Sequence, residues 1–197
     1  MPPDHRGSFR HLGDEMIHRG YIWNVVSGSF VDPEGRPFTR DIVRSPGAVA
    51  VVPVLDHQSD DPQVVLLRQY RAAFDAAILE IPAGMRDVAG EAPDETARRE
   101  LIEESGYSPG ALVELHQFLP SPGMTDAILH VYLALDLAPV ERRTHGPEED
   151  HMEVLVVSLA EALDMVVRGD IRDAKATIGL LLAERHLRRM SDPRVTS

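Results

Sequence analysis

The chain has 197 residues, of which 43% are apolar, so it can fill the core of one domain with a small appended element. Its 32 acidic residues against 20 Lys and Arg residues give a formal net charge of −12, which disfavours binding to nucleic acid or to anionic lipid. The absence of cysteine excludes disulfides and thiolate chemistry, and no stretch reaches the roughly 20 apolar residues that span a bilayer, so we expect a cytoplasmic protein with no membrane partner.

Short apolar runs bounded by turn residues predict strands in the first half of the chain. Residues 21–31 and 37–43 flank the turn sequence DPEG and predict an N-terminal hairpin. Three further strands are predicted at residues 48–55, 63–71 and 76–84. Because a lone hairpin is only marginally stable in water, we expect the N-terminal one to dock on a partner chain.

A helix is predicted over residues 94–105, where the sequence DETARRELIEES changes to a helical period. Ala97 and Leu101 supply a narrow apolar stripe. Asp94 is expected to cap the N-terminus of this helix, and Gly106 is expected to end it in a left-handed conformation.

Three glutamates gather on one side of this predicted helix. Glu100 and Glu104 lie one turn apart, with Glu103 beside them. Like charges at this spacing destabilise a helix by roughly a few tenths of a kcal/mol per pair, unless something compensates. Mg²⁺ would compensate, because it takes carboxylate oxygens, and Gly84 permits a tight loop that could bring the Ala83 carbonyl to the same ion. The alternative is a solvated helix face whose glutamates pair with arginines.

The second half of the chain predicts more strands and two helices. Strands are expected at residues 111–119, 128–135 and 152–159. Ser158 and Glu161 form a capping-box pair before a short helix that Gly169 ends, and a last helix runs from about residue 173 to residue 190. This order of elements predicts an α+β fold with a mixed sheet between helices.

The stretch from Ala83 to Tyr107 resembles the signature of the Nudix hydrolases, G-x5-E-x7-R-E-U-x-E-E-x-G-U, in which U is an aliphatic or aromatic residue. The residues that match in type and spacing are Glu91, Arg99, Glu100, Leu101, Glu103, Glu104, Gly106 and Tyr107. Gly84 departs from the pattern, because six residues rather than five separate it from Glu91. The resemblance implies a Nudix-type mixed sheet sandwiched between helices, with the N-terminal hairpin as an extension.

The same resemblance implies a metal centre that uses Mg²⁺, with Mn²⁺ as a substitute. Its implied ligands are the Ala83 carbonyl, Glu100, Glu103, Glu104 and Asp150, and Glu103 also counts among the catalytic residues. Arg99 would have a structural role, paired with Glu91, and would hold the loop before the helix against it.

The flanking segments RQYR, LEIPAG, SPGMTD and DAKATIGLLLA resemble the branch that cleaves ADP-ribose and nucleotide sugars, although Ala127 stands where that branch often has a glutamate. The implied activity is hydrolysis of a small-molecule nucleoside diphosphate sugar, ADP-ribose, to AMP and ribose 5-phosphate. The implied assembly is a homodimer with exchanged N-terminal strands. Residues 1–45 would form the dimerisation extension, 46–190 the catalytic domain and 191–197 a flexible tail. The implied substrate-binding residues are Trp23, Arg40, Arg71, Glu80 and Pro122.

A general base for the attacking water is expected in the loop HGPEEDH, from His145 to His151. The resemblance implies Glu148, with Glu149 in contention, and either histidine could serve by its pKa. Three other functions stay open: cleavage of another nucleotide sugar, oxidised nucleotide or dinucleoside polyphosphate, a non-catalytic nucleotide-sensing module, or an acidic protein whose glutamates are purely structural.

Overall fold

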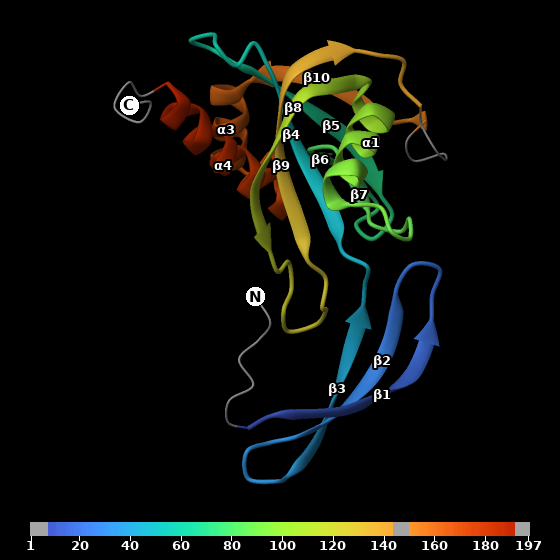
Figure 1. Ribbon diagram of the computed structural model, residues 1–197. Coiled ribbons are helices and arrows are strands. Elements are labelled where there is room, and N and C mark those ends of the chain that lie inside the picture. Colours follow the sequence, from blue (N-terminus) through green and yellow to red (C-terminus); the bar gives the residue numbers. More distant parts are fainter. Residues whose placement is uncertain (1–7, 144–149, 192–197) are drawn as a thin grey trace. The chain divides into compact units, whose positions relative to one another are not determined.

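The computed structural model describes residues 8–143 and 150–191, which fall into two compact units (Figure 1). The first unit comprises Met1–Gly47 and Leu119–Ile128, and the second comprises Ala48–Phe118 and Leu129–Ser197. In the described residues, no helix has both the length and the apolar character that crossing a bilayer requires.

The first unit is built on an antiparallel sheet in the order β1 (Arg10–Arg19), β2 (Asn24–Val31) and β3 (Pro37–Arg44). The predicted hairpin is present as β2 and β3. Its turn is held by Asp32, whose Oδ1 accepts hydrogen bonds from the backbone N–H groups of Glu34 and Arg36 at 3.0 and 2.8 Å.

Strand β1 was not predicted. All ten of its residues are exposed, and apolar side chains at Leu12, Met16 and Ile17 do not alternate with polar ones. A strand with both faces in water lacks the period of two that identifies a half-buried strand. The extension is therefore a three-stranded sheet rather than a simple hairpin.

The second unit contains a seven-stranded mixed sheet. Its core order is β10 (Glu153–Ser158), β5 (Gln63–Arg71), β4 (Ala48–Leu55), β9 (Leu129–Pro139) and β8 (Tyr107–Phe118). The pair β4 and β9 is parallel, and the other pairs are antiparallel. The bounds predicted for β4 and β5 are confirmed; β4 is a buried apolar run, and β5 contains one at residues 64–67.

The prediction of a single strand over residues 76–84 is wrong in one respect. The segment is divided into β6 (Ala76–Glu80), which pairs with β5, and β7 (Ala83–Met85), which pairs with β4. The chain changes partner at Ile81 and Pro82, and Pro82 has no N–H to give to a ladder. This change of partner brings Ala83 and Gly84 beside the first residues of β4.

Helices cover both faces of this sheet. Helix α1 (Pro93–Ser105) lies on one face, and α3 (Leu159–Arg168) and α4 (Ala174–Met190) lie on the other (Figure 1). Side chains of β4 enter the two cores alternately. Those at positions 49 and 51 pack with Ala97 and Leu101 of α1, and those at positions 50, 52 and 54 share a core with Leu180 of α4. The predicted sandwich of a mixed sheet between helices is confirmed.

The helix ends follow local sequence signals, with one correction. The N-cap of α1 is Ala92 rather than Asp94, because Pro93 occupies the first helical position and the Glu95 carboxylate accepts a hydrogen bond from the Ala92 N–H at 3.1 Å. Gly106 and Gly169 end α1 and α3 with φ angles of 74° and 83°, as predicted.

Candidate active site

The acidic side of α1 lies directly against strand β7. The Glu104 carboxylate is 3% exposed, and its Oε2 accepts a hydrogen bond from the backbone N–H of Ala83 at 2.7 Å. The Glu100 carboxylate lies over Gly84, where an added Cβ would stand 1.9 Å from the carboxyl carbon. Only glycine therefore lets the strand and the helix approach this closely with Glu100 in place.

Arg99 connects the loop before α1 with the acidic side of the helix. Its Nε and Nη2 donate to the two carboxylate oxygens of Glu91, both at 3.1 Å. Its Nη1 donates to Glu100 at 2.7 Å and to Glu103 at 3.0 Å. Hydrogen bonds from Arg99 hold the pKa of the Glu91 carboxyl below its usual range, and those to Glu91 raise the pKa of Arg99. The Arg99 guanidinium thus contacts three carboxylates. A structural role for Arg99 stays a prediction.

The Glu80 carboxylate accepts hydrogen bonds from two basic side chains. It lies at the end of β6, is 3% exposed and accepts two parallel hydrogen bonds from Arg71, from Nε at 2.7 Å and from Nη2 at 2.6 Å. Lys175 of α4 donates to the same carboxylate at 2.5 Å. Burial raises the pKa of Glu80, but the hydrogen bonds and charges of Arg71 and Lys175 outweigh burial and lower it.

Lys175 is the residue of this cluster that sequence reasoning missed. It is separated from Glu80 by 95 positions, and a lysine in the first turn of a helix is usually solvent-exposed. The segment DAKATIGLLLA, which contains it, was singled out only by resemblance. Its contact with a buried carboxylate is visible only in the folded structure.

Three predicted substrate-binding residues belong to the first unit. Trp23 lies between β1 and β2 and is 54% exposed. Arg40 of β3 is exposed, with its guanidinium 5.0 Å from the centre of the Phe38 ring. Pro122 is also exposed, in the segment 119–128, which is joined to β3 by a hydrogen bond from Val43 N–H to the Met124 carbonyl at 2.9 Å. Their roles stay predictions.

The base predicted at Glu148 or Glu149 lies outside the described residues, as does His145. Asp150 and His151 are described, and both are exposed. Over residues 8–143 and 150–191, no three His, Asp or Glu side chains are arranged as a ready metal site. The donors beside β7 nevertheless suit a hard divalent cation, because they are carboxylate oxygens and the glycine opposite Glu100 leaves that carboxylate room.

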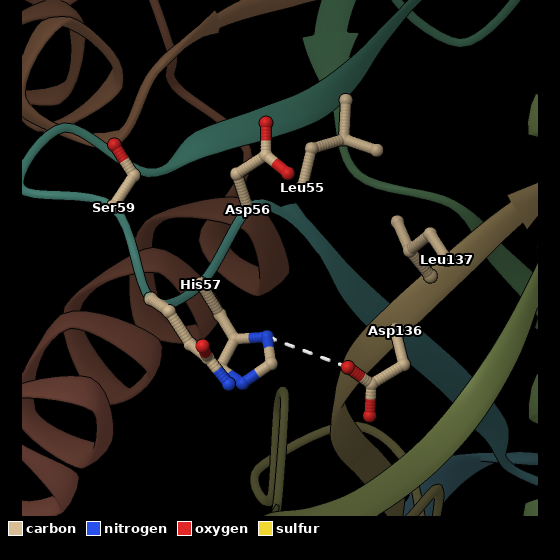
Figure 2. A pocket seen from close by; sticks show the side chains of 7 residues that line it. Leu55, Asp56, His57, Ser59, Asp136 and Leu137 are labelled. Atoms are coloured by element: carbon tan, nitrogen blue, oxygen red, sulfur yellow. Dashed lines mark ion pairs between the residues drawn. The ribbon is translucent and has the colours of Figure 1, made fainter.

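A separate cavity of about 440 Å³ lies at the far end of β4 (Figure 2). In it, His57 Nδ1 stands 3.7 Å from Asp136 Oδ1. Its lining residues are Leu55, Asp56, His57, Gln58, Ser59, Asp136 and Leu137. Gly84 pairs with Val49, six residues before Leu55, so roughly 20 Å of strand separates the cavity from the glutamates of α1. None of the predicted site residues lines this cavity.

Comparisons with known proteins agree with this geometry. The profile of the NUDIX domain matches residues 44–178. The chain is 36% identical to an ADP-ribose pyrophosphatase of Bacillus subtilis (strain 168), over 86% of this chain and 89% of the relative. It is 37% identical to a methanol dehydrogenase activator of Bacillus methanolicus, over 84% of this chain and 87% of that protein.

A solved structure shows the same fold. The crystal structure of an ADP compounds hydrolase superposes with a TM-score of 0.79, over 94% of this chain and 97% of that one, at 23% sequence identity. The likeness extends beyond the residues matched by the domain profile and confirms the Nudix-type architecture expected from the sequence.

Proposed function

The chain belongs to the NUDIX family of hydrolases, and we propose that it cleaves the diphosphate of ADP-ribose, with Mg²⁺ or Mn²⁺, to give AMP and ribose 5-phosphate. The observation that carries this proposal is the seating of Glu100 and Glu104 against Gly84 and Ala83 of β7. The name of the B. subtilis relative supports the choice of substrate.

The side chains of Glu100, Glu103 and Glu104 and the Ala83 carbonyl would hold the metal, with Asp150 as a further ligand. When bound, a divalent ion neutralises charge on the diphosphate and makes a bound water more acidic. The Arg99 guanidinium fixes the directions of Glu100 and Glu103 through its bonds of 2.7 and 3.0 Å. These contacts would keep the ligands oriented before substrate arrives.

The substrate would be held by arginine and attacked by a water that a carboxylate deprotonates. Arg71 suits the diphosphate or the terminal ribose, because a guanidinium binds phosphate oxygens through charge-assisted hydrogen bonds. Glu80 would contact the adenine or ribose edge, and Trp23, Arg40 and Pro122 would also bind the substrate. Glu148, or Glu149, would accept the proton of the attacking water.

The first test measures release of the nucleoside monophosphate from ADP-ribose, a GDP-linked sugar, an oxidised nucleoside triphosphate and a dinucleoside polyphosphate, with Mg²⁺ and then with excess EDTA. We expect ADP-ribose to have the highest kcat/KM. Chelation should lower its turnover by about 10³-fold or more, since the metal contributes several kcal/mol to the transition state. Re-addition of Mg²⁺ should restore the rate, as a control for damage by the chelator.

Each other result of this assay has a defined meaning. Preference for the GDP-linked sugar or another diphosphate would select the alternative substrate class. Binding of nucleotides without hydrolysis of any would favour the sensing module. AMP release that is unaffected by EDTA would contradict the assignment of the α1 glutamates.

We also propose that residues 1–45 mediate a homodimer with exchanged N-terminal strands. The support is the exposure of Phe9, Leu12, Met16, Ile17 and Trp23, apolar side chains carried by or next to β1. Light scattering at micromolar protein should give twice the mass of one chain, and deletion of residues 1–19 should lower that mass to one chain. A monomeric mass for the full chain would contradict the dimer.

A further inference from the structure

We propose that Lys175 is a positioning residue for the substrate diphosphate: with Asp173 it sets the charge around Glu80, and Glu80 in turn aims Arg71. The inference rests on the proposed function, because it names the residues that prepare the same site for its phosphates. It assigns a role to the first turn of α4, on the opposite face of the sheet from α1.

The four groups form one continuous chain of contacts. Lys175 Nζ donates to Glu80 at 2.5 Å and lies 3.0 Å from Asp173 Oδ1. The second oxygen of Asp173 accepts a hydrogen bond from the Ala176 N–H at 2.8 Å and caps α4. The Glu80 carboxylate then holds Arg71 through both of its oxygens. The capped end of α4 therefore determines where the Glu80 carboxylate lies.

Arg71 is held at one edge, and its remaining donors are left for a ligand. An arginine has five N–H donors, and Glu80 takes one from Nε and one from Nη2. In the described part of the chain, the Nη1 of Arg71 donates to no protein acceptor. The side chain is 35% exposed, and its guanidinium interacts electrostatically with Glu104 of α1. The guanidinium is thus within electrostatic range of one of the glutamates proposed to hold the metal.

The charges in this cluster balance. Arg71 and Lys175 carry two positive charges, and Glu80 and Asp173 carry two negative ones, so the sum is zero. Without Lys175 the sum would be −1, next to the position of a diphosphate that is itself anionic. Without the charge of Asp173 the sum would be +1. If Lys175 acts through charge and orientation, loss of Lys175 must weaken substrate binding, and loss of the Asp173 charge must strengthen it.

If Lys175 had a purely structural role, different results would be expected. Removing one partner of a buried ion pair destabilises a protein, because the other charge is left without compensation. Loss of Lys175 and loss of the Asp173 charge would then both lower stability, and neither would improve substrate binding. The sign of the change in affinity separates the two roles.

The test compares Lys175→Met, Lys175→Arg and Asp173→Asn with the unaltered full chain. We expect Lys175→Met to raise the KM for ADP-ribose about tenfold with a smaller change in kcat, and Lys175→Arg to restore KM to within about threefold. Asp173→Asn keeps an oxygen that can cap α4 and should lower KM by about threefold. Calorimetric titration with ADP-ribose in EDTA should rank the affinities in the same order without hydrolysis.

The outcomes separate this inference from the proposed function. If the unaltered chain hydrolyses ADP-ribose and Lys175→Met leaves both KM and the calorimetric affinity unchanged, the inference fails alone. If no diphosphate is hydrolysed, the proposed function fails, and the calorimetric ranking still decides the role of Lys175. If Lys175→Met does not fold, Asp173→Asn decides, because unchanged or weaker binding by that variant contradicts the inference.

Discussion

Replacement of Glu104 by Gln is expected to lower the turnover of ADP-ribose by about 10³-fold while the protein stays folded. Glutamine has almost the same size as glutamate, and its amide oxygen can still accept the hydrogen bond that the Ala83 N–H donates at 2.7 Å. The substitution therefore removes one negative charge from the acidic side of α1 and keeps this hydrogen bond. The melting temperature should change little, because the substitution also relieves the repulsion between Glu104 and the like charges of Glu100 and Glu103.

The measurement is kcat and kcat/KM with saturating Mg²⁺, together with thermal unfolding followed by circular dichroism. The matched control is Glu161→Gln, which removes one charge from an exposed glutamate of α3 that pairs with Arg168 at 2.7 Å. We expect that control to retain activity within about twofold, since exposed ion pairs contribute little. Wild-type turnover by the Glu104→Gln variant would defeat the metal assignment.

Gly84→Ala is expected to have the second-largest effect, a loss of about 10²-fold in kcat. The added Cβ would lie 1.9 Å from the carboxyl carbon of Glu100, and 2.1 and 2.3 Å from its two oxygens. Since no side chain tolerates such contacts, either Glu100 must leave its position or β7 must move away from α1. Both movements displace a proposed ligand, and small displacements at a reacting centre reduce rates strongly.

A glycine in the loop between β7 and α1 provides the control for this substitution. Gly90 has a φ of 84°, and a Cβ there would meet nothing within 4 Å. Asn tolerates this left-handed conformation, so Gly90→Asn should keep wild-type kcat and nearly wild-type stability. Both variants are assayed with a series of Mg²⁺ concentrations. Full activity of Gly84→Ala at every concentration would show that the position of Glu100 against β7 is unimportant for the reaction.

The sequence predicted those parts of the fold that leave a regular pattern. The run that became β4 and residues 64–67 of β5 are apolar because both faces are buried there, and Gly106 and Gly169 end helices through their tolerance of positive φ. Strand β1 left no such pattern because water surrounds it. The division between β6 and β7 depends on which strand each segment pairs with, and spacing along the chain does not encode that choice.

The same limit applies to the candidate site. Helical spacing is sufficient to place Glu100 and Glu104 on one side of α1, because that relation is local. The contact of Glu100 with Gly84 and the bridge from Lys175 to Glu80 join segments distant in sequence, so composition and periodicity do not reveal them. The pairing of Arg71 with Glu80 is intermediate, since the two residues lie on the paired strands β5 and β6 but not at opposing positions.

The parallel pairing of β4 with β9 has a consequence for how the protein acquires its structure. The pair begins with Ala48 and Leu129, which are 129 − 48 = 81 positions apart. Helix α1 is synthesised between them, yet the core in which it packs includes Tyr132 and Ala134 of β9. During translation, α1 therefore leaves the ribosome before this part of its support exists, and formation of the catalytic scaffold must wait for this long-range closure, the slow kind of step in folding.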